Sequence, residues 1–379
     1  MRLLRRLSRR RPLDASPVDA RRGPLLQLRL GRPGFEDRRD LHRWFLDLAR
    51  RGEAEEACSR LGRWILADRP GEGADWEHAS DAAVRLVYWG LGVGVLGEEL
   101  DPDLWRRMAG SARAHAEFTL REDSPHPVAQ GSGLVVAGSL FPDLSELWVG
   151  EGLSRLARAM PEVVAVDGSG APDALQRAVC LGLVARSFAT LPPEAEGALY
   201  RGASYLRVVS AGGPPLDTAR HPALLGESAE ELADALGVED DLDIGREWSL
   251  RAYRATNRAV GHARLKGVTS RLLVEHGSLS WHLDGEALIG ALGPAEGELS
   301  SARVDDRRAT LAWGARKVLA EGGRVQILEQ GCAGLRVQRG PGWERLKVGL
   351  DKQLCWQEQG DWLVGVGSAE RVRCSFELR

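Results

Sequence analysis

The chain has 379 residues, a formal net charge of −3 and 43% hydrophobic residues, which is enough apolar material for a packed core. The charge balance gives no reason to expect a nucleic-acid partner, because the basic residues concentrate at one end. The five cysteines are widely spaced and form no zinc-type cluster, so we expect reduced thiols, no metal site and no cofactor.

Residues 1–35 are rich in arginine and proline and are predicted to form a basic N-terminal arm. This segment lacks the apolar core of a signal peptide, and the chain contains no apolar run long enough to span a membrane. We therefore expect a cytoplasmic protein whose basic arm is able to contact an anionic membrane surface.

Helical periodicity dominates residues 36–245. In the first helical segment, Trp44, Phe45 and Leu48 recur on one face, and Gly52 ends the pattern. Further segments with a helical pattern and short connections follow, at 53–68, 80–97, 101–118, 143–160, 173–191, 193–209 and 227–237. Short connections favour antiparallel neighbouring helices, so this region is predicted to be a helical domain.

The period of the pattern changes from 3.6 residues to two near Gly245. Alternating apolar and polar residues separated by glycine-rich turns are typical of strands and hairpins, and they occupy 270–285, 307–331 and 360–379. We expect helices from about residue 40 to 237, strands from about 263 to the end, and an antiparallel β domain over 246–379. The fold class is predicted to be α+β.

Several residues occur in an order that resembles the heparinase II/III-like polysaccharide lyases, over roughly residues 40 to 220. The matching pieces are Arg85 with Trp89, Gly133 with Leu134, Phe141 with Pro142, Trp148, and Asp167 with Gly168. The resemblance implies a partial (α/α) toroid of helical hairpins followed by an antiparallel β-sandwich.

The resemblance also implies β-elimination on a uronate-containing polysaccharide. That reaction removes a proton next to the uronate carboxylate, so the family neutralises the carboxylate with an Asn-His pair and uses a Tyr and a further His as base and acid. By position, the His of the pair falls on His126, and Gln130 stands where an acidic residue is common.

The chain departs from the family at the other chemical positions. The Asn position falls on Pro125, which has neither a side-chain amide nor a backbone N–H. Arg177 stands near the expected Tyr, and the segment that carries the second His is missing. The catalytic Asn, Tyr and second His of the family are therefore predicted to be absent.

The remaining candidates divide by role. If acid–base chemistry survives, His126 and Tyr88 are the candidate catalytic residues; Tyr88 lies one helical turn from Arg85. Arg85 is a candidate ligand for a sugar carboxylate, and each of these residues also has a purely structural interpretation. The other candidate substrate-binding residues are Gln130, Trp76, Trp89, Trp148 and Arg177.

Three functions remain open. The leading hypothesis is a degenerate, non-catalytic lyase homologue that binds an acidic polysaccharide or a partner in polysaccharide metabolism. The alternatives are an active lyase with a rearranged site built from His126, Tyr88 and Arg85, and a structural scaffold whose groove is filled by its own side chains. The sequence does not indicate an oligomeric state.

Overall fold

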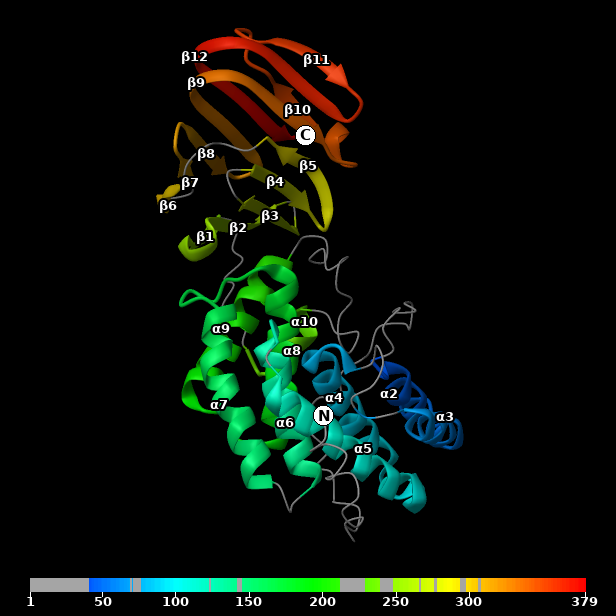
Figure 1. Cartoon of the computed structure of the whole chain (residues 1–379). Coiled ribbons are helices and arrows are strands. Elements are labelled where there is room, and N and C mark those ends of the chain that lie inside the picture. The colour runs from blue at the N-terminus through cyan, green and yellow to red at the C-terminus, as the bar shows by residue number, and fades with distance from the viewer. Residues whose placement is uncertain are drawn as a thin grey trace. The chain divides into compact units, whose positions relative to one another are not determined.

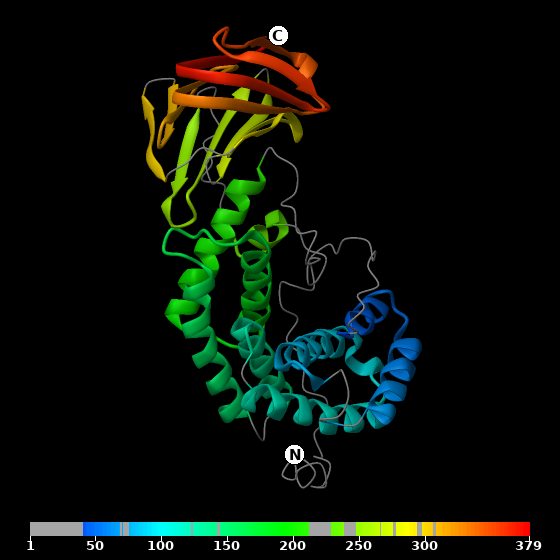
Figure 2. The same cartoon turned by 45° about the horizontal axis from the view of Figure 1, so that its top comes forward.

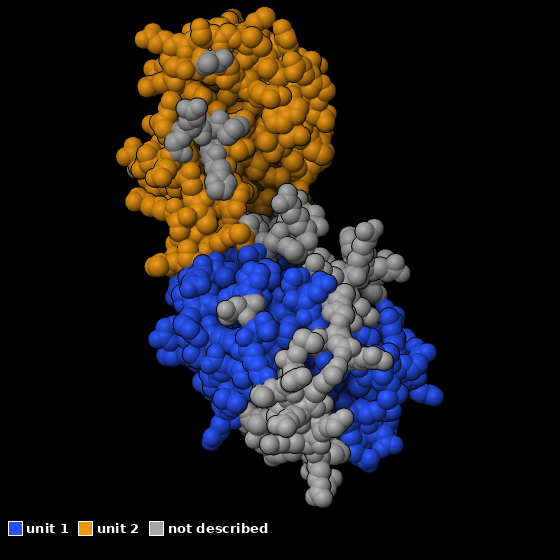
Figure 3. All heavy atoms as spheres, viewed as in Figure 1, with its two compact units in different colours: residues 1–164, 173–202, 218–237 blue, residues 165–172, 203–217, 238–379 orange. Residues whose placement is uncertain are grey.

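The computed structural model describes residues 41–379, except for 69, 71–75, 123, 142–144, 212–228, 239–247, 266, 276–277, 294–297 and 306–307. The arm predicted at residues 1–35 lies outside the described residues. The chain divides into two compact units (Figure 3). The helical unit comprises residues 1–164, 173–202 and 218–237, and the sheet unit comprises residues 165–172, 203–217 and 238–379.

Helices come first in the chain and antiparallel strands follow, which confirms the prediction of an α+β protein (Figure 1). The described helices are α2 (Arg43–Arg50), α3 (Ala54–Ala67), α4 (Ala79–Leu96), α5 (Pro102–Arg121), α6 (Pro127–Leu140), α7 (Ser145–Val163), α8 (Pro172–Phe188), α9 (Pro193–Ser210) and α10 (Ala229–Ala235). Short 3-10 turns occupy Gly97–Glu99, Arg254–Thr256 and Trp343–Arg345. No described residue between 300 and 379 belongs to an α-helix.

Helix α6 is buried along almost its whole length, which explains why its sequence is apolar all round. Its glycines allow neighbouring backbones to approach closely. A methyl group on Gly133 would lie 2.6 Å from the carbonyl oxygen of Ala83 in α4, and one on Gly131 would lie 2.9 Å from the carbonyl oxygen of Gly152 in α7. The packing of α6 between α4 and α7 therefore requires glycine at these points.

Helix α5 begins with a side-chain cap at Asp101. The side chain of Asp101 accepts hydrogen bonds from the backbone N–H groups of Asp103 and Leu104, at 3.1 and 3.2 Å. Pro102 occupies the first turn, where its missing N–H costs nothing.

The strands form one antiparallel sheet of twelve strands. They are β1 (Ser249–Tyr253), β2 (Arg258–Leu265), β3 (Val268–Glu275), β4 (Ser278–Leu283), β5 (Glu286–Leu292), β6 (Leu299–Asp305), β7 (Arg308–Trp313), β8 (Arg316–Glu321), β9 (Arg324–Arg339), β10 (Leu346–Gly349), β11 (Cys355–Gln359) and β12 (Trp362–Leu378). The order β1-β2-β3-β4-β5-β9-β8-β7-β6 is hydrogen-bonded throughout, and β12 pairs with β9, β10 and β11.

Two long strands, β9 and β12, run side by side (Figures 1 and 2). They join the half of the sheet that contains β1–β5 to the half that contains β6–β8. The first part of β9 pairs with β8, and its last part pairs with β5. Between these parts, Gly331 and Gly334 adopt positive φ values, and β12 carries a register shift between Val366 and Ala369. Such irregularities let a long strand bend. The resemblance implied an antiparallel β-sandwich; the strands form one large antiparallel sheet, in which hydrogen bonding continues from one half to the other.

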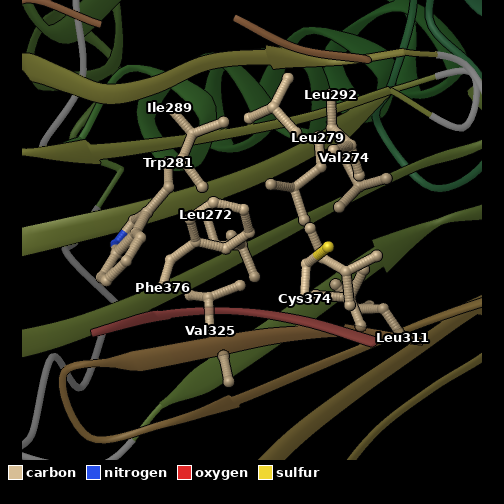
Figure 4. Close-up of a cluster of buried hydrophobic side chains, with 14 of the residues drawn as sticks. Leu272, Val274, Leu279, Trp281, Ile289, Leu292, Leu311, Val325, Cys374 and Phe376 are labelled. Atoms are coloured by element: carbon tan, nitrogen blue, oxygen red, sulfur yellow. The ribbon is translucent and has the colours of Figure 1, made fainter. Parts of the chain in front are cut away.

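The two halves enclose a common apolar core (Figure 4). Leu272 and Trp281 come from the β3–β5 half, and Val325 and Phe376 come from β9 and β12. Their side chains point toward one another in Figure 4, and each is completely buried. The alternation of apolar residues along these strands places every second side chain in this core.

The sheet starts earlier than predicted, at Ser249 instead of about residue 263. The strand β2 lacks a clear alternation of large apolar and polar residues, because its core face carries small residues such as Gly261. A methyl group at Gly261 would lie only 3.2 Å from the Trp248 side chain, which fills the space instead. The opposite face of β2 carries Arg258 and His262, which are also buried.

Candidate functional sites

Three of the predicted site residues, Trp76, Arg85 and Trp89, meet in one cluster of rings in the helical unit. We call it the Trp-His-Arg cluster; its members are His42, Trp44, Trp64, Trp76, Arg85, Trp89 and His115. They come from the start of α2, from α3, from the residues just before α4, and from α4 and α5. The indole N–H of Trp89 donates to Nδ1 of His42 at 2.9 Å.

His115 stands at the centre of this cluster and is completely buried. The guanidinium Nε of Arg85 donates to its Nε2 at 3.1 Å, so Nε2 is the acceptor. The proton therefore lies on Nδ1, which donates to the carbonyl oxygen of Ser111 at 2.8 Å. Burial, followed by the charge of Arg85, lowers the pKa of His115 to about 3.

His42 is held neutral in the same way. Burial is the largest cause, and the charges of Arg85, His115 and Arg60 add to it, so the pKa of His42 lies well below its ordinary value. The Arg85 guanidinium therefore lies beside the neutral imidazole of His115 and has its central carbon 5.8 Å from the Trp64 ring centroid.

The cluster reaches the surface through Trp44 and Trp64, which are half-buried. The exposed Arg60 lies over the Trp44 ring, with its guanidinium carbon 4.2 Å from the ring centroid. A ring face beside a cation matches the chemistry of an acidic sugar, because the ring offers an apolar surface and the cation attracts a carboxylate.

The side chain of Gln130 donates hydrogen bonds to carbonyl oxygens at the C-terminal end of α5. Its side-chain amide nitrogen donates to the carbonyl oxygens of Thr119 and Glu122 at 3.1 and 2.6 Å, where α5 ends. Arg155 from α7 donates to the carbonyl oxygens of Thr119 and Leu120 at 2.9 and 2.7 Å. Carbonyls at a helix C-terminus lack intrahelical partners, so these side chains satisfy them.

The other predicted residues are not members of the Trp-His-Arg cluster as defined above. His126 is exposed and immediately precedes α6, with Pro127 in the first turn. Tyr88 is buried on α4, and Arg177 is half-buried on α8. Trp148, another candidate substrate-binding residue, is buried and packs against Phe141 in a separate aromatic group.

A second group of polar side chains lies on the outer face of the sheet and was missed by the sequence analysis. Arg258 pairs with Glu275 and donates to the hydroxyl of Tyr205 at 2.6 Å and to the carbonyl oxygen of Gly170 at 3.0 Å. The carboxylate of Asp167 accepts from the backbone N–H of Ala255 at 3.1 Å. These contacts fasten residues 165–172 and the end of α9 onto the strands.

A row of three side chains crosses the same face. Arg271 on β3 lies opposite His262 on β2 and His282 on β4 in the strand register. His262 Nε2 contacts the carbonyl oxygen of Ala211 at 3.1 Å, and Arg271 donates to the carbonyl oxygen of Val209. The available signal was the even spacing of Arg258 and His262 along one strand, which places them on the same face, and the pairing of β2 with β3 adds Arg271 to that face.

Within the described part of the chain, no three His, Cys, Asp or Glu side chains gather as they would around a metal ion. None of the described helices combines the length and the apolar character that crossing a membrane would require.

The comparisons with known proteins bear on the fold. No protein-family model matches the chain, and no curated protein matches its sequence. Among solved structures, a heparan sulfate lyase (a HepC mutant) from Pedobacter heparinus is similar, with a TM-score of 0.57 and 11% sequence identity. The similarity covers 99% of this chain and 82% of the lyase. At this identity it shows a remote relationship in fold.

Proposed function

We propose that this protein is a degenerate relative of the heparinase II/III-like lyases that binds an acidic, uronate-containing polysaccharide without cleaving it. The fold similarity to a heparan sulfate lyase over nearly the whole chain supports the family and the class of ligand. The proposal extends to architecture: the helical unit is a partial (α/α) toroid of helical hairpins.

The observation that carries the proposal is the arrangement at the surface edge of the Trp-His-Arg cluster. Half-buried Trp44 and Trp64 offer ring surface for a sugar, and Arg60 lies over one of these rings. These rings pack against His42 and Trp89, whose side chains are hydrogen-bonded to each other. The rings of Trp44 and Trp64 therefore lose little conformational freedom when a ligand binds. Rigid aromatic groups beside an arginine are typical of strong binding contacts.

The absence of cleavage is proposed from the chemistry that β-elimination needs. A base must come within hydrogen-bond distance of the proton that it removes, and donors must neutralise the carboxylate. Tyr88 is buried, whereas His126 is exposed on the loop before α6. Pro125 contributes no donor. Each lost donor typically reduces the rate by about a hundredfold or more.

Binding is tested by isothermal titration calorimetry with heparan sulfate, heparin, hyaluronan and alginate oligosaccharides. Trp44→Ala and Arg60→Gln should each weaken the affinity for at least one of these glycans, about tenfold for the tryptophan, because buried tryptophan contacts typically contribute more than 1 kcal/mol. Arg158→Gln is the matched control, since it removes the same charge from an exposed position on α7.

Equal glycan affinities of the wild type and both site variants would show that the glycan does not bind at the Trp-His-Arg cluster. No binding by the wild type would leave the scaffold hypothesis.

A further inference from the structure

Among the described residues of the sheet unit, three arginine side chains are buried, and two of them face a carboxylate. Arg258 pairs with Glu275, and Arg316 donates to the carboxylate of Glu329 from Nε and Nη2 at 2.9 and 2.8 Å. Burial works to lower the pKa of Arg258, but Tyr205 and Glu275 outweigh it and the pKa is raised. A buried guanidinium normally needs such a partner, because its desolvation is costly.

Arg271 is the exception among them. It is 3% exposed, and its hydrogen bond to the carbonyl oxygen of Val209 uses one of five N–H donors. Its Nε is buried and has no hydrogen-bond partner among the described residues. Burial lowers the pKa of Arg271 to about 10, with no carboxylate in the described part of the chain to oppose it. Glu275, on the same face of β3, pairs with Arg258.

His282, which lies beside Arg271, also has a buried nitrogen without a hydrogen-bond partner among the described residues. It lies directly opposite Arg271 in the β3–β4 register, is 7% exposed, and its Nδ1 is buried with no hydrogen-bond partner among the described residues. Burial, then the charge of Arg271, lowers the pKa of His282 to about 4. The imidazole is therefore neutral near pH 7, and a neutral imidazole is able to donate from Nδ1.

We propose that Arg271 and His282 form a binding site for an oxyanion, a carboxylate, sulfate or phosphate group, on the outer face of the β3–β4 pair. One oxyanion supplies both missing partners: its charge compensates the buried guanidinium, and its oxygens accept from Arg271 Nε and His282 Nδ1. His262 and the end of α9 bound the site on the β2 side. This site is independent of the function proposed for the helical unit.

The site is tested by following the melting temperature while inorganic sulfate is titrated at constant ionic strength. A bound ion raises the melting temperature of the wild type in a saturable way. Arg271→Met should abolish this response, and His282→Phe should weaken the sulfate affinity about ten- to a hundredfold, as expected for a lost hydrogen bond to a charged group. Arg308→Gln, which removes an exposed arginine on β7, should respond as the wild type does.

An equal sulfate response in the wild type and Arg271→Met would overturn the proposal, because sulfate also stabilises proteins without binding. A wild type with no saturable response would overturn it as well.

A second comparison distinguishes an anion site from a simple helix cap. Without sulfate, Arg271→Met should melt at or above the wild-type temperature, because it removes a buried charge for which no described residue supplies an acidic partner. Arg258→Met should melt at a lower temperature, because it removes the guanidinium that pairs with Glu275 and donates to the Tyr205 hydroxyl. An equal decrease of the melting temperature in Arg271→Met and Arg258→Met would show that Arg271 serves only to hold Val209, and the proposal would fail.

If Arg271→Met does not fold, equilibrium dialysis of the wild type and His282→Phe with radiolabelled sulfate replaces the melting series. One ion bound per wild-type chain, with weaker binding by the variant, supports the site, and no bound ion overturns it. Parallel titrations with phosphate, glucuronate and a sulfated disaccharide identify the source. A response to the inorganic ions alone indicates a free ion, and a tighter response to the sugars indicates an acidic group of a glycan.

Discussion

Acidification should destabilise the helical unit through His115. In the folded protein the pKa of His115 is about 3, whereas the ordinary value is 6.5. As the pH falls through 6.5, the unfolded chain binds a proton at this position and the folded chain does not. The stability that depends on neutral His115 is therefore complete above about pH 6.5 and is lost progressively as the pH falls toward 3.

The size of this effect follows from the two pKa values. One pH unit corresponds to 1.36 kcal/mol, so the fall from 6.5 to pH 5 costs about 2 kcal/mol and the whole difference of about 3.5 units costs about 5 kcal/mol. His42 adds to the loss in the same direction, because its pKa also lies well below the ordinary value.

The test compares the wild type with His115→Gln, whose amide keeps a donor for Ser111 and an acceptor for Arg85 but does not titrate. Urea unfolding is followed by helical circular dichroism near pH 7 and near pH 5. The loss of unfolding free energy between these conditions should be about 2 kcal/mol smaller in His115→Gln than in the wild type.

His78→Gln, at an exposed position, should leave the difference unchanged. An unchanged pH dependence in His115→Gln would refute the assignment of a neutral, buried His115.

Further substitutions test the packing of the helical unit and the exposure of one thiol. Gly133→Ala should destabilise by about 1–3 kcal/mol in thermal unfolding, because its methyl group would lie 2.6 Å from the carbonyl oxygen of Ala83. Gly110→Ala on α5, where no atom lies within 4 Å of the added methyl group, should stabilise by about 0.5–1 kcal/mol. Gln130→Leu should lower the unfolding free energy by about 1–3 kcal/mol, since it leaves two carbonyl oxygens at the end of α5 without this donor. Cys355 is exposed, so mass spectrometry should find it alkylated under native conditions before the buried thiols.

The order of helices and strands was predictable because periodicity is a local property of the sequence. The change of period near Gly245 falls between α10 and β1. The prediction failed at β2, where both faces are buried, because polar residues such as Arg258 and His262 cover the outer face. Partners far away in sequence, Tyr205 and Ala211, satisfy these polar groups, and a local pattern carries no information about them.

The candidate site was predictable in part for the same reason. Arg85 and Trp89 lie about one turn apart on α4, so their proximity follows from helical spacing, and Trp76 lies just before this helix. Their partners His42 and His115 lie 47 residues before Trp89 and 30 residues after Arg85 along the chain. The contacts that decide their protonation depend on tertiary packing, which a single sequence does not specify.

The central claim is that the protein binds an acidic polysaccharide and leaves it intact. The most direct measurement is size-exclusion chromatography of stoichiometric protein with full-length heparan sulfate after long incubation, recording polymer length and the ultraviolet absorbance of unsaturated uronate ends. We expect the polymer to elute with the protein at its original length, without new absorbance. Shortened chains that carry unsaturated ends would contradict the claim and support an active lyase, and a polymer that elutes apart from the protein would contradict binding to this glycan.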